Sequence, residues 1–400
     1  MRIGIYGGTF NPPHTGHRKA AREAIGALGL DKLLVIPTAE PPHKELPEES
    51  AGPEQRLELA RLCFGGLEGA EVSPLEMERG GKSYTADTVA ELRRLYPEAE
   101  LWLIMGGDMF LSLEKWYRSG ELLREAGIAV SARADERERI LAEAEKLRWE
   151  RGARVRFIDE PPIVISSTAL RDCLRRAEGR EYLTEETYAY IVKNRLYGAR
   201  AELGWLREQA VKLLDPRRVP HVLGVEQEAV RLAERWGAEV YDAAAAGILH
   251  DITKKCNDKE QLQLCEKYGT MIDNLEREIP KLLHAKTGAD LAWHEFGVSP
   301  AIREAIRWHT TGRENMSLLE KIIYLADYIE PNRSFEGLDR LRALAYEDLD
   351  EALRLGLQMS LDEMEERRIV PHPNSLRALR YIEKELDRKR AEPYSGIGAI

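Results

Sequence analysis

The sequence predicts two domains of different fold class, an α/β domain with a parallel sheet followed by an all-α domain. The chain has 400 residues, enough for two ordinary domains with separate cores. Short apolar runs alternate with helical segments in its first half, whereas from about Leu203 helical apolar spacing continues with almost no strand-like alternation. Glycines in YGARAELG interrupt two helical patterns between Gly198 and Gly204. We therefore expect domains at residues 1–198 and 205–392.

The strands of the first domain are predicted from apolar runs that carry no polar face. Such runs indicate a parallel sheet covered by helices on both sides. Amphipathic spacing between them predicts helices in HRKAAREAIGALG and PEQRLELARLCF. The charged segment ADERERILAEAEKLRWERGAR predicts a solvated helix, and VRFIDEPPIVISSTALRDCL predicts one or two further strands and a helix start. The expected strands are residues 2–7, 32–38, 100–108 and 126–132.

The helices of the second domain are predicted from apolar residues that recur with helical spacing. This pattern is repeated along the second half of the chain and predicts a domain built from helices alone. The expected helical segments are residues 226–237, 240–249, 259–269, 300–309 and 317–329.

Composition limits the partners and the compartment. The formal net charge of −10 argues against a surface that coats nucleic acid, since neutralising phosphates requires clustered Lys and Arg. No charged leader is evident, and no uncharged apolar run approaches the roughly 20 residues of a membrane span. We expect a cytoplasmic protein with no nucleic-acid or membrane partner, and a homo-oligomer is left open. The cysteines form no CxxC pair, which favours a reducing compartment; they are Cys63, Cys173, Cys256 and Cys265.

The segment GGTFNPPHTGH combines a glycine turn, two prolines and two histidines. Small residues at Gly7-Gly8-Thr9 allow a phosphate to approach main-chain N–H groups closely. The prolines stiffen the connection, and the next helix starts at His14-Thr15-Gly16-His17, beside its positive end. Each histidine alone could be a solvated helix-start residue. The combination of turn, prolines and spacing instead favours an anion site.

With this segment and four others, the first half resembles the Rossmann-like nucleotidylyltransferases that carry an HxGH signature. Within that superfamily it is similar to nicotinate mononucleotide adenylyltransferases, over most of residues 1–197. The other supporting segments are PPHK, KSYTADT, GGD followed by Trp116, and ISSTALR. The resemblance implies transfer of AMP from ATP to nicotinate mononucleotide, with Mg²⁺, giving nicotinate adenine dinucleotide and pyrophosphate. Such a reaction relies on positioning and charge stabilisation.

The resemblance also implies roles for individual residues. His14 and His17 would act on the phosphates as catalytic residues, and Trp116 would stack on the pyridine ring unless it only fills the core. Thr85 and the backbone near Tyr117 would meet the pyridine carboxylate. Cations and hydroxyls would converge on the ATP phosphates, and the serines could equally form a helix N-cap, a role compatible with phosphate binding. The remaining implied binding residues are Gly7, Gly8, Thr9, Asn11, His43, Lys44, Asp108, Ser166, Ser167, Thr168 and Arg171, with Arg56 a weaker candidate.

The helical half contains histidines and aspartates in an order that favours a metal site. They are His221, the adjacent His250 and Asp251, His284, His309 and Asp327. A mixed nitrogen and oxygen set suits iron, manganese or another divalent transition ion, and leaves positions for water and substrate. One histidine on an apolar helix is more often a core residue. The full ordered set favours metal-assisted attack on phosphorus.

These residues lie in AAAAGILHDITKK, LLHAKTGA, IRWHTTGR and KIIYLADYIEPNR, and with them residues 205 to about 390 resemble the HD-domain phosphohydrolases. They are similar to the symmetrical diadenosine tetraphosphate hydrolases, which implies cleavage of diadenosine tetraphosphate into two ADP with Fe²⁺, Fe³⁺ or Mn²⁺. His221, His250, Asp251 and Asp327 would be ligands. His284, His309 and Thr310 would face the phosphate, unless the two histidines bind a second ion. Arg333 is a further binding candidate, with Lys254 and Arg313 as additional cations.

Other readings keep the two folds and change the function. The first domain could act on pantetheine phosphate or another mononucleotide, against which KSYTADT and Trp116 argue. The second could hydrolyse a dNTP or a guanosine polyphosphate, against which HTTGR and ADYIEPNR argue. The second domain could also be a nucleotide sensor without catalysis that regulates the transferase. That alternative leaves the complete set of expected ligands unexplained.

Overall fold

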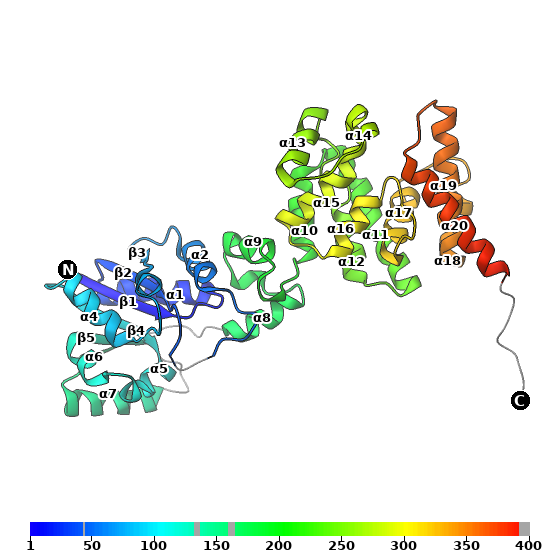
Figure 1. Ribbon diagram of the computed structural model, residues 1–400. Coiled ribbons are helices and arrows are strands. Elements are labelled where there is room, and N and C mark those ends of the chain that lie inside the picture. The colour runs from blue at the N-terminus through cyan, green and yellow to red at the C-terminus, as the bar shows by residue number, and fades with distance from the viewer. Residues whose placement is uncertain (43–44, 132–136, 159–164, 392–400) are drawn as a thin grey trace, which may run out of the picture. The chain divides into compact units, whose positions relative to one another are not determined.

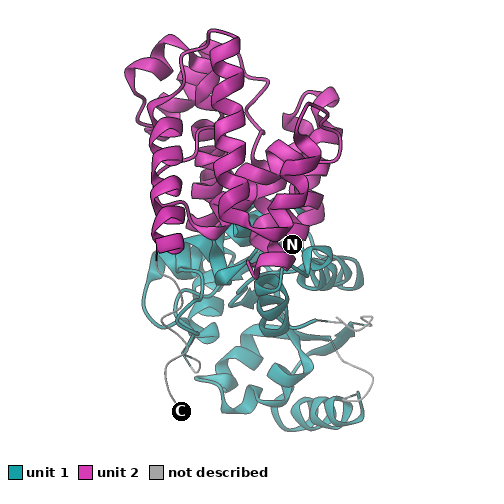
Figure 2. Ribbon diagram, turned by 90° about the vertical axis from the view of Figure 1, so that its right-hand side faces the viewer, with its two compact units in different colours: residues 1–200 teal, residues 201–400 magenta. Residues whose placement is uncertain are grey.

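A computed structural model describes residues 1–42, 45–131, 137–158 and 165–391, and it divides into two compact units. Unit 1 is Met1–Arg200 and unit 2 is Ala201–Ile400 (Figures 1 and 2). The predicted fold class is confirmed, because unit 1 contains a parallel six-stranded sheet with helices and unit 2 is helical in its described part.

The sheet of unit 1 has the strand order β3-β2-β1-β4-β5-β6, and every neighbouring pair is parallel. The order reverses direction between β1 and β4, as in doubly wound sheets, where ligands bind beyond the carboxyl ends of the strands. The strands are β1 Arg2–Gly8, β2 Lys32–Pro37, β3 Ala70–Val72, β4 Glu100–Gly106, β5 Ala126–Ser131 and β6 Val155–Ile158.

Both faces of the sheet are apolar, which explains why its strands have no polar face in the sequence. Alternate residues of β4 pack into two separate hydrophobic clusters, with Leu103 in one and Ile104 in the other. The first cluster includes Val89 and Leu122 from the helices on that face, and the second includes Phe64 from the other. Figure 1 shows helices on both sides of the sheet.

The helices of unit 1 include those predicted and several short ones that were not. The charged segment forms α7, and residues 134–136 of its predicted start lie outside the described residues, as do residues 159–164 beyond β6. KSYTADT runs into the start of α4. The helices are α1 Thr15–Leu28, α2 Pro53–Phe64, α3 Leu75–Arg79, α4 Thr85–Leu95, α5 Gly107–Leu111, α6 Ser119–Glu125, α7 Arg137–Arg151, α8 Ser167–Arg175 and α9 Glu185–Lys193.

Unit 2 is built around a close pair of helices, α11 and α12. A Cβ atom added to Gly247 of α12 would lie 2.9 Å from the Cα atom of Glu226 in α11, so the glycine permits this approach. The alanine run before it is also buried. The helices are α10 Leu203–Leu213, α11 Val219–Trp236, α12 Val240–Leu249, α13 Asp258–Tyr268, α14 Asn274–Glu278, α15 His284–Glu295, α16 Pro300–Trp308, α17 Leu318–Ile329, α18 Leu338–Glu347, α19 Leu349–Glu366 and α20 Pro373–Ala391.

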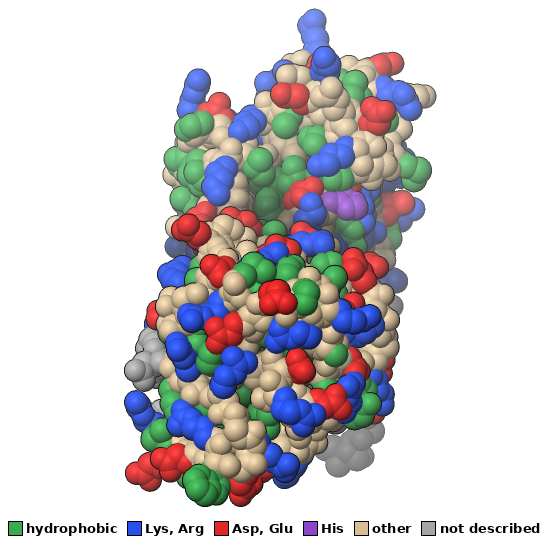
Figure 3. Space-filling view, turned by 90° about the vertical axis from the view of Figure 1, so that its left-hand side faces the viewer, with side chains coloured by type: hydrophobic (Ala, Val, Ile, Leu, Met, Phe, Trp, Pro, Cys, Tyr) green, Lys and Arg blue, Asp and Glu red, His purple; other side chains and the backbone are tan. Residues whose placement is uncertain are grey.

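The surface is mixed in charge, and Figure 3 shows basic and acidic side chains interspersed over the face that it draws. Among the described helices, none combines the length and the apolar character needed to cross a membrane. The cysteines are all free, and burial raises the pKa of the Cys63 thiol to about 12.

Candidate nucleotide cavity and candidate metal cluster

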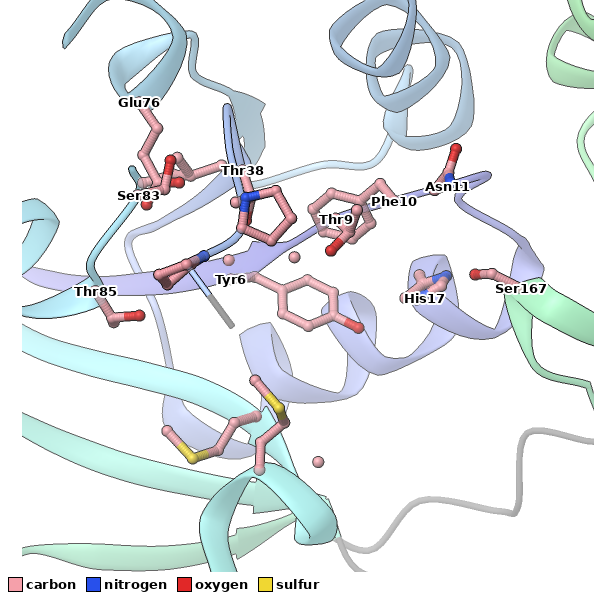
Figure 4. A pocket seen from close by; sticks show the side chains of 18 of the residues that line it. Tyr6, Thr9, Phe10, Asn11, His17, Thr38, Glu76, Ser83, Thr85 and Ser167 are labelled. Atoms are coloured by element: carbon pink, nitrogen blue, oxygen red, sulfur yellow. The ribbon is translucent and has the colours of Figure 1, made fainter. Parts of the chain in front are cut away.

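Unit 1 contains a cavity of about 640 Å³ at the carboxyl ends of β1 and β4, where the strand order reverses. Most of the predicted binding residues line it, although they come from distant parts of the sequence (Figure 4). The predicted residues that line it are Gly7, Gly8, Thr9, Asn11, His17, Thr85, Asp108, Trp116, Ser166, Ser167, Thr168 and Arg171. His43 and Lys44 lie outside the described residues.

The end of β1 and the loop after it pack around the ring of Phe10. Gly7 lines the cavity, and a Cβ atom there would meet nothing within 4 Å. A Cβ atom on Gly8 would lie 3.1 Å from the Phe10 ring. Phe10 has a left-handed φ of 48°, and its ring packs edge-on to Tyr6 and Phe64, with centroids 5.6 Å away in both cases. The aromatic contacts therefore stabilise an otherwise unfavourable backbone conformation.

The two histidines of the HxGH segment differ in exposure and are joined by a hydrogen bond. His14 is the N-cap of α1, is only 3% exposed and does not line the cavity, whereas His17 does. The backbone N–H of His14 donates to Nδ1 of His17 over 3.2 Å, so Nε2 of His17 carries its proton and can donate to an anion. Burial lowers the pKa of His14 to about 4. The pKa of His17 is also lowered, mainly by burial and further by the charge of the neighbouring His14.

The start of α8 lies beside the same loop. Ser166 is the N-cap and accepts from the N–H of Ala169, so the predicted N-cap role is present. The Ser167 hydroxyl donates to the carbonyl of Pro12 over 2.9 Å, and Arg171 Nη1 donates to the carbonyl of Asn11 over 2.7 Å. Figure 4 shows Asn11, His17 and Ser167 in one region of the cavity. Two helix N-termini and a guanidinium thus gather at this end, which favours phosphate binding.

The opposite part of the cavity is aromatic. Trp116 lines it while also packing against the hydrophobic core, and its Nε1 donates to Ser112 Oγ over 3.2 Å. The rings of Tyr84 and Tyr117 lie 4.7 Å apart, centroid to centroid. Thr85, at the first position of α4, presents a hydroxyl beside them. This part offers a flat platform and hydrogen-bond donors, which suit a planar ring bearing a polar group.

Two buried charged residues, Arg56 and Glu76, lie at or near the cavity. Arg56 is fully buried and donates to the carbonyls of Thr9, Thr38 and Ala39, so it joins the loops after β1 and β2 and does not reach into the cavity. Glu76 lines the cavity, and burial raises its pKa. Arg56 was the weaker phosphate-binding candidate of the sequence interpretation, and its guanidinium is instead paired with backbone carbonyls. Glu76 was not singled out from the sequence.

The histidines and aspartates of unit 2 come from five different helices or their ends and meet at one point. Nε2 of His221 lies 3.2 Å from Asp327 Oδ1 and 3.8 Å from Asp251 Oδ2. On the other side of the same carboxylate, Asp251 Oδ1 lies 3.4 Å from His284 Nε2 and 3.6 Å from His309 Nε2. Within this cluster, three groups could hold an ion: His221, His250 and Asp251; His250, His309 and Asp327; and Asp251, His284 and His309.

The imidazoles are oriented by the chain itself. Nδ1 of His250, His284 and His309 donates to the carbonyl of the residue three positions earlier, over 2.8, 2.7 and 2.7 Å respectively. Their Nε2 atoms are therefore unprotonated in the neutral form and point into the cluster. Burial lowers the pKa of His284 to about 3.

The donor set fits a divalent cation. Within the described residues, Nε2 of His221, Nε2 of His250 and Oδ1 of Asp251 are buried and make no hydrogen bond. Burial acts to raise the pKa of Asp251, yet the surrounding imidazoles, His250 foremost, hold it well below its usual range. A carboxylate flanked by imidazole nitrogens is a donor set that suits a transition ion.

Cations surround this cluster. Arg218 forms an ion pair with Asp251, and Lys254 Nζ lies 2.8 Å from His284 Nε2. Arg333 donates to Asp327 Oδ1 over 2.8 Å, and the Thr310 hydroxyl lies 3.2 Å from His309 Nε2. Arg313 is instead paired with the buried carboxylate of Glu320 over 2.8 Å. The sequence interpretation missed Arg218, whose signal was its position one helical turn before His221.

Comparison with known proteins first defines the class. The cytidylyltransferase-like family matches residues 5–173, and the HD domain family matches residues 218–332. HD domains bind divalent metals, in agreement with the donor set of unit 2.

Closer relatives then define the particular family of the first half. A probable nicotinate-nucleotide adenylyltransferase of Gemmatimonas aurantiaca is 37% identical over 200 residues, which cover 49% of this chain and 92% of that protein. One of Carboxydothermus hydrogenoformans is 39% identical over 198 residues, covering 49% and 98%. Through its cytidylyltransferase-like half, the chain belongs to the family of nicotinate-nucleotide adenylyltransferases.

A solved structure is similar to part of the chain. It is a predicted HD superfamily hydrolase involved in NAD metabolism from Clostridium acetobutylicum, with 35% identity and a TM-score of 0.45. The match covers 47% of this chain and 100% of that one.

Proposed function

We propose that residues 1–198 transfer AMP from ATP to nicotinate mononucleotide, giving nicotinate adenine dinucleotide and pyrophosphate. One observation carries this proposal: a single cavity joins a phosphate-binding end at α1 and α8 to an aromatic end at Trp116. Membership of the adenylyltransferase family supports the same reaction.

In this reaction a phosphate oxygen of the mononucleotide attacks the α-phosphorus of ATP, a new P–O bond forms, and the bond to pyrophosphate breaks. Negative charge develops on oxygens, so catalysis needs positioned donors. His17 Nε2–H and the Arg171 guanidinium are suited to donate to these oxygens, and Mg²⁺ accompanies ATP. Arg171 is the one cation among the described residues that line the cavity, so its removal leaves the helix N-termini as the main positive groups.

A product assay with ATP, nicotinate mononucleotide and Mg²⁺ tests this proposal. We expect pyrophosphate and nicotinate adenine dinucleotide in equal amounts, with kcat lowered by about 100-fold in His17→Ala. The control is His294→Ala, an exposed histidine of unit 2 that lies outside the metal cluster. Turnover of pantetheine phosphate but not of nicotinate mononucleotide would reject the substrate assignment.

We further propose that residues 205–392 are a metal-dependent phosphohydrolase that converts diadenosine tetraphosphate and water into two ADP. The converging donor set supports hydrolysis at phosphorus, and Arg218, Lys254 and Arg333 supply charge for a polyphosphate. The motifs HTTGR and ADYIEPNR support the particular substrate through their resemblance to the symmetrical hydrolases. A bound Fe²⁺, Fe³⁺ or Mn²⁺ ion would supply Lewis acidity and lower the pKa of a water molecule.

Hydrolysis assays on chelator-treated chain, with and without added Mn²⁺ or Fe²⁺, test this second proposal. We expect ADP as the single nucleotide product, formed only with added ion. Formation of AMP plus ATP would reject symmetrical cleavage. Hydrolysis of a dNTP, with no hydrolysis of diadenosine tetraphosphate, would reassign the substrate. An ion that binds without turnover of any of these nucleotides would favour the sensor alternative.

A further inference from the structure

We propose that Glu330 is a positioning residue for the metal site, which holds His221 in the tautomer and orientation that a bound ion requires. The inference rests on the proposed metal site and extends it to a residue that does not itself contact the ion. Glu330 is the residue after α17, and its side chain is 2% exposed.

The contacts of Glu330 point its carboxylate at one imidazole. Its Oε1 atom lies 3.2 Å from Nδ1 of His221, which therefore carries the proton and donates. Its Oε2 atom accepts from the backbone N–H of Asn332 over 2.7 Å and from Asn332 Nδ2 over 2.9 Å. Both oxygens are thus occupied, and the carboxylate cannot turn away without losing a hydrogen bond.

His221 differs from the other imidazoles of the cluster in its partner. His250, His284 and His309 each donate from Nδ1 to a backbone carbonyl, whereas His221 donates to a carboxylate. A negatively charged partner makes the opposite nitrogen, Nε2, a stronger ligand as well as orienting it. Nε2 of His221 is the atom that faces Asp327 and Asp251.

The sequence of α11 leaves room for this carboxylate. Gly224 lies one turn after His221, and a Cβ atom there would overlap Glu330 Oε2 and lie 3.0 Å from Asn332 Nδ2. Alanine is the better helix former by about 1 kcal/mol, so a glycine inside this helix weakens it locally. The glycine is explained by the space that Glu330 needs.

Binding of Mn²⁺ to the full chain tests the inference, measured by loss of the free-ion EPR signal. We expect Glu330→Gln and Glu330→Ala to raise the Kd by about 10-fold to 100-fold, with the smaller effect in the glutamine variant, which retains a neutral acceptor. Gly224→Ala should raise the Kd in the same range even though it removes no polar group. The matched control is Glu228→Gln. Glu228 is a buried carboxylate on α11, two turns after His221, and it accepts a hydrogen bond from the Tyr346 hydroxyl.

Melting of each variant in chelator separates positioning from general stability. The proposal holds if Glu330→Gln or Gly224→Ala melts near the wild-type temperature and still binds Mn²⁺ more weakly. It is overturned if all of the Glu330 and Gly224 variants keep the wild-type Kd, or if Glu228→Gln weakens binding equally. A wild-type chain that binds no Mn²⁺, or a His221→Ala variant that binds normally, would overturn the proposed metal site itself and the inference with it.

Discussion

At the scale of single residues, His14 combines a structural position with an unusual acidity. It caps α1 from a buried position, and burial lowers its pKa from 6.5 to about 4. Unfolding restores the ordinary value, so between these pH values the unfolded chain binds more protons than the folded one. The contribution of His14 to stability is therefore complete above about pH 6.5 and is lost as the pH falls toward 4.

We expect an NMR titration of the histidine Cε1–H signals to show His14 changing charge near pH 4 in the folded chain. His14→Asn, which assigns the signal, should also reduce the loss of unit 1 stability between pH 6.5 and 4. A titration midpoint near 6.5 in the folded protein would contradict the burial seen here.

Trp116 has a role in the core as well as in the cavity, so its replacement needs a paired design. We expect Trp116→Ala to raise KM for nicotinate mononucleotide by about 10-fold to 100-fold, since stacking on an aromatic ring is worth about 1–3 kcal/mol. Trp116→Phe keeps a platform and should lose much less. Steady-state kinetics with each substrate varied in turn provide the measurement, and an equal rise in KM for ATP would indicate general damage.

The sequence predicted residue types better than it predicted which side chains face the ligand. GGTFNPPHTGH indicated two histidines at a helix start, and the structure has them there. It gave no sign that His14 would be covered, because the covering atoms come from other parts of the chain. Arg56 likewise was a candidate for phosphate binding, whereas three carbonyls from two loops occupy its guanidinium.

At the scale of elements, the contact between α11 and α12 depends on Gly247. We expect Gly247→Ala to destabilise unit 2 by about 1–3 kcal/mol, since the added methyl group meets the backbone of Glu226. Hydrogen exchange of the α11 and α12 amides in urea measures the free energy of unfolding of unit 2 separately from that of unit 1. Gly204→Ala in α10, where an added Cβ meets nothing within 4 Å, is the control and should not destabilise the helix. Equal protection in both variants would show that the helices can separate without cost.

Long, strongly patterned elements were predictable and short ones were not. The apolar runs of β1, β2, β4 and β5 and the spacing of α2 predicted real elements. β3 has three residues and α3 and α5 have five each, too few to show a period. The order of the strands in the sheet could not be predicted either, because the sequence of a parallel strand does not indicate which strand lies beside it. Only the family resemblance implied that α8 and the loop after β1 meet the same phosphates, and the structure supplies the contacts between them.

At the scale of the whole molecule, the two units are each compact. We expect separately produced chains 1–200 and 201–391 to fold alone and to keep their proposed reactions within about twofold of the full chain. Circular dichroism and the two product assays make the measurement. A fragment that aggregates, or that regains activity only when the other is added, would show that the units depend on each other.

The hydrophobic clusters of the sheet lie entirely within residues 1–200, so that core is complete before the helical half begins. This has a consequence for the relative amounts of the two halves in the cell. One messenger and one translation event deliver both halves, and their ratio is fixed at one to one whatever the expression level. Encoding both halves in one chain thus fixes a stoichiometry that the packing of the sheet's core does not itself require.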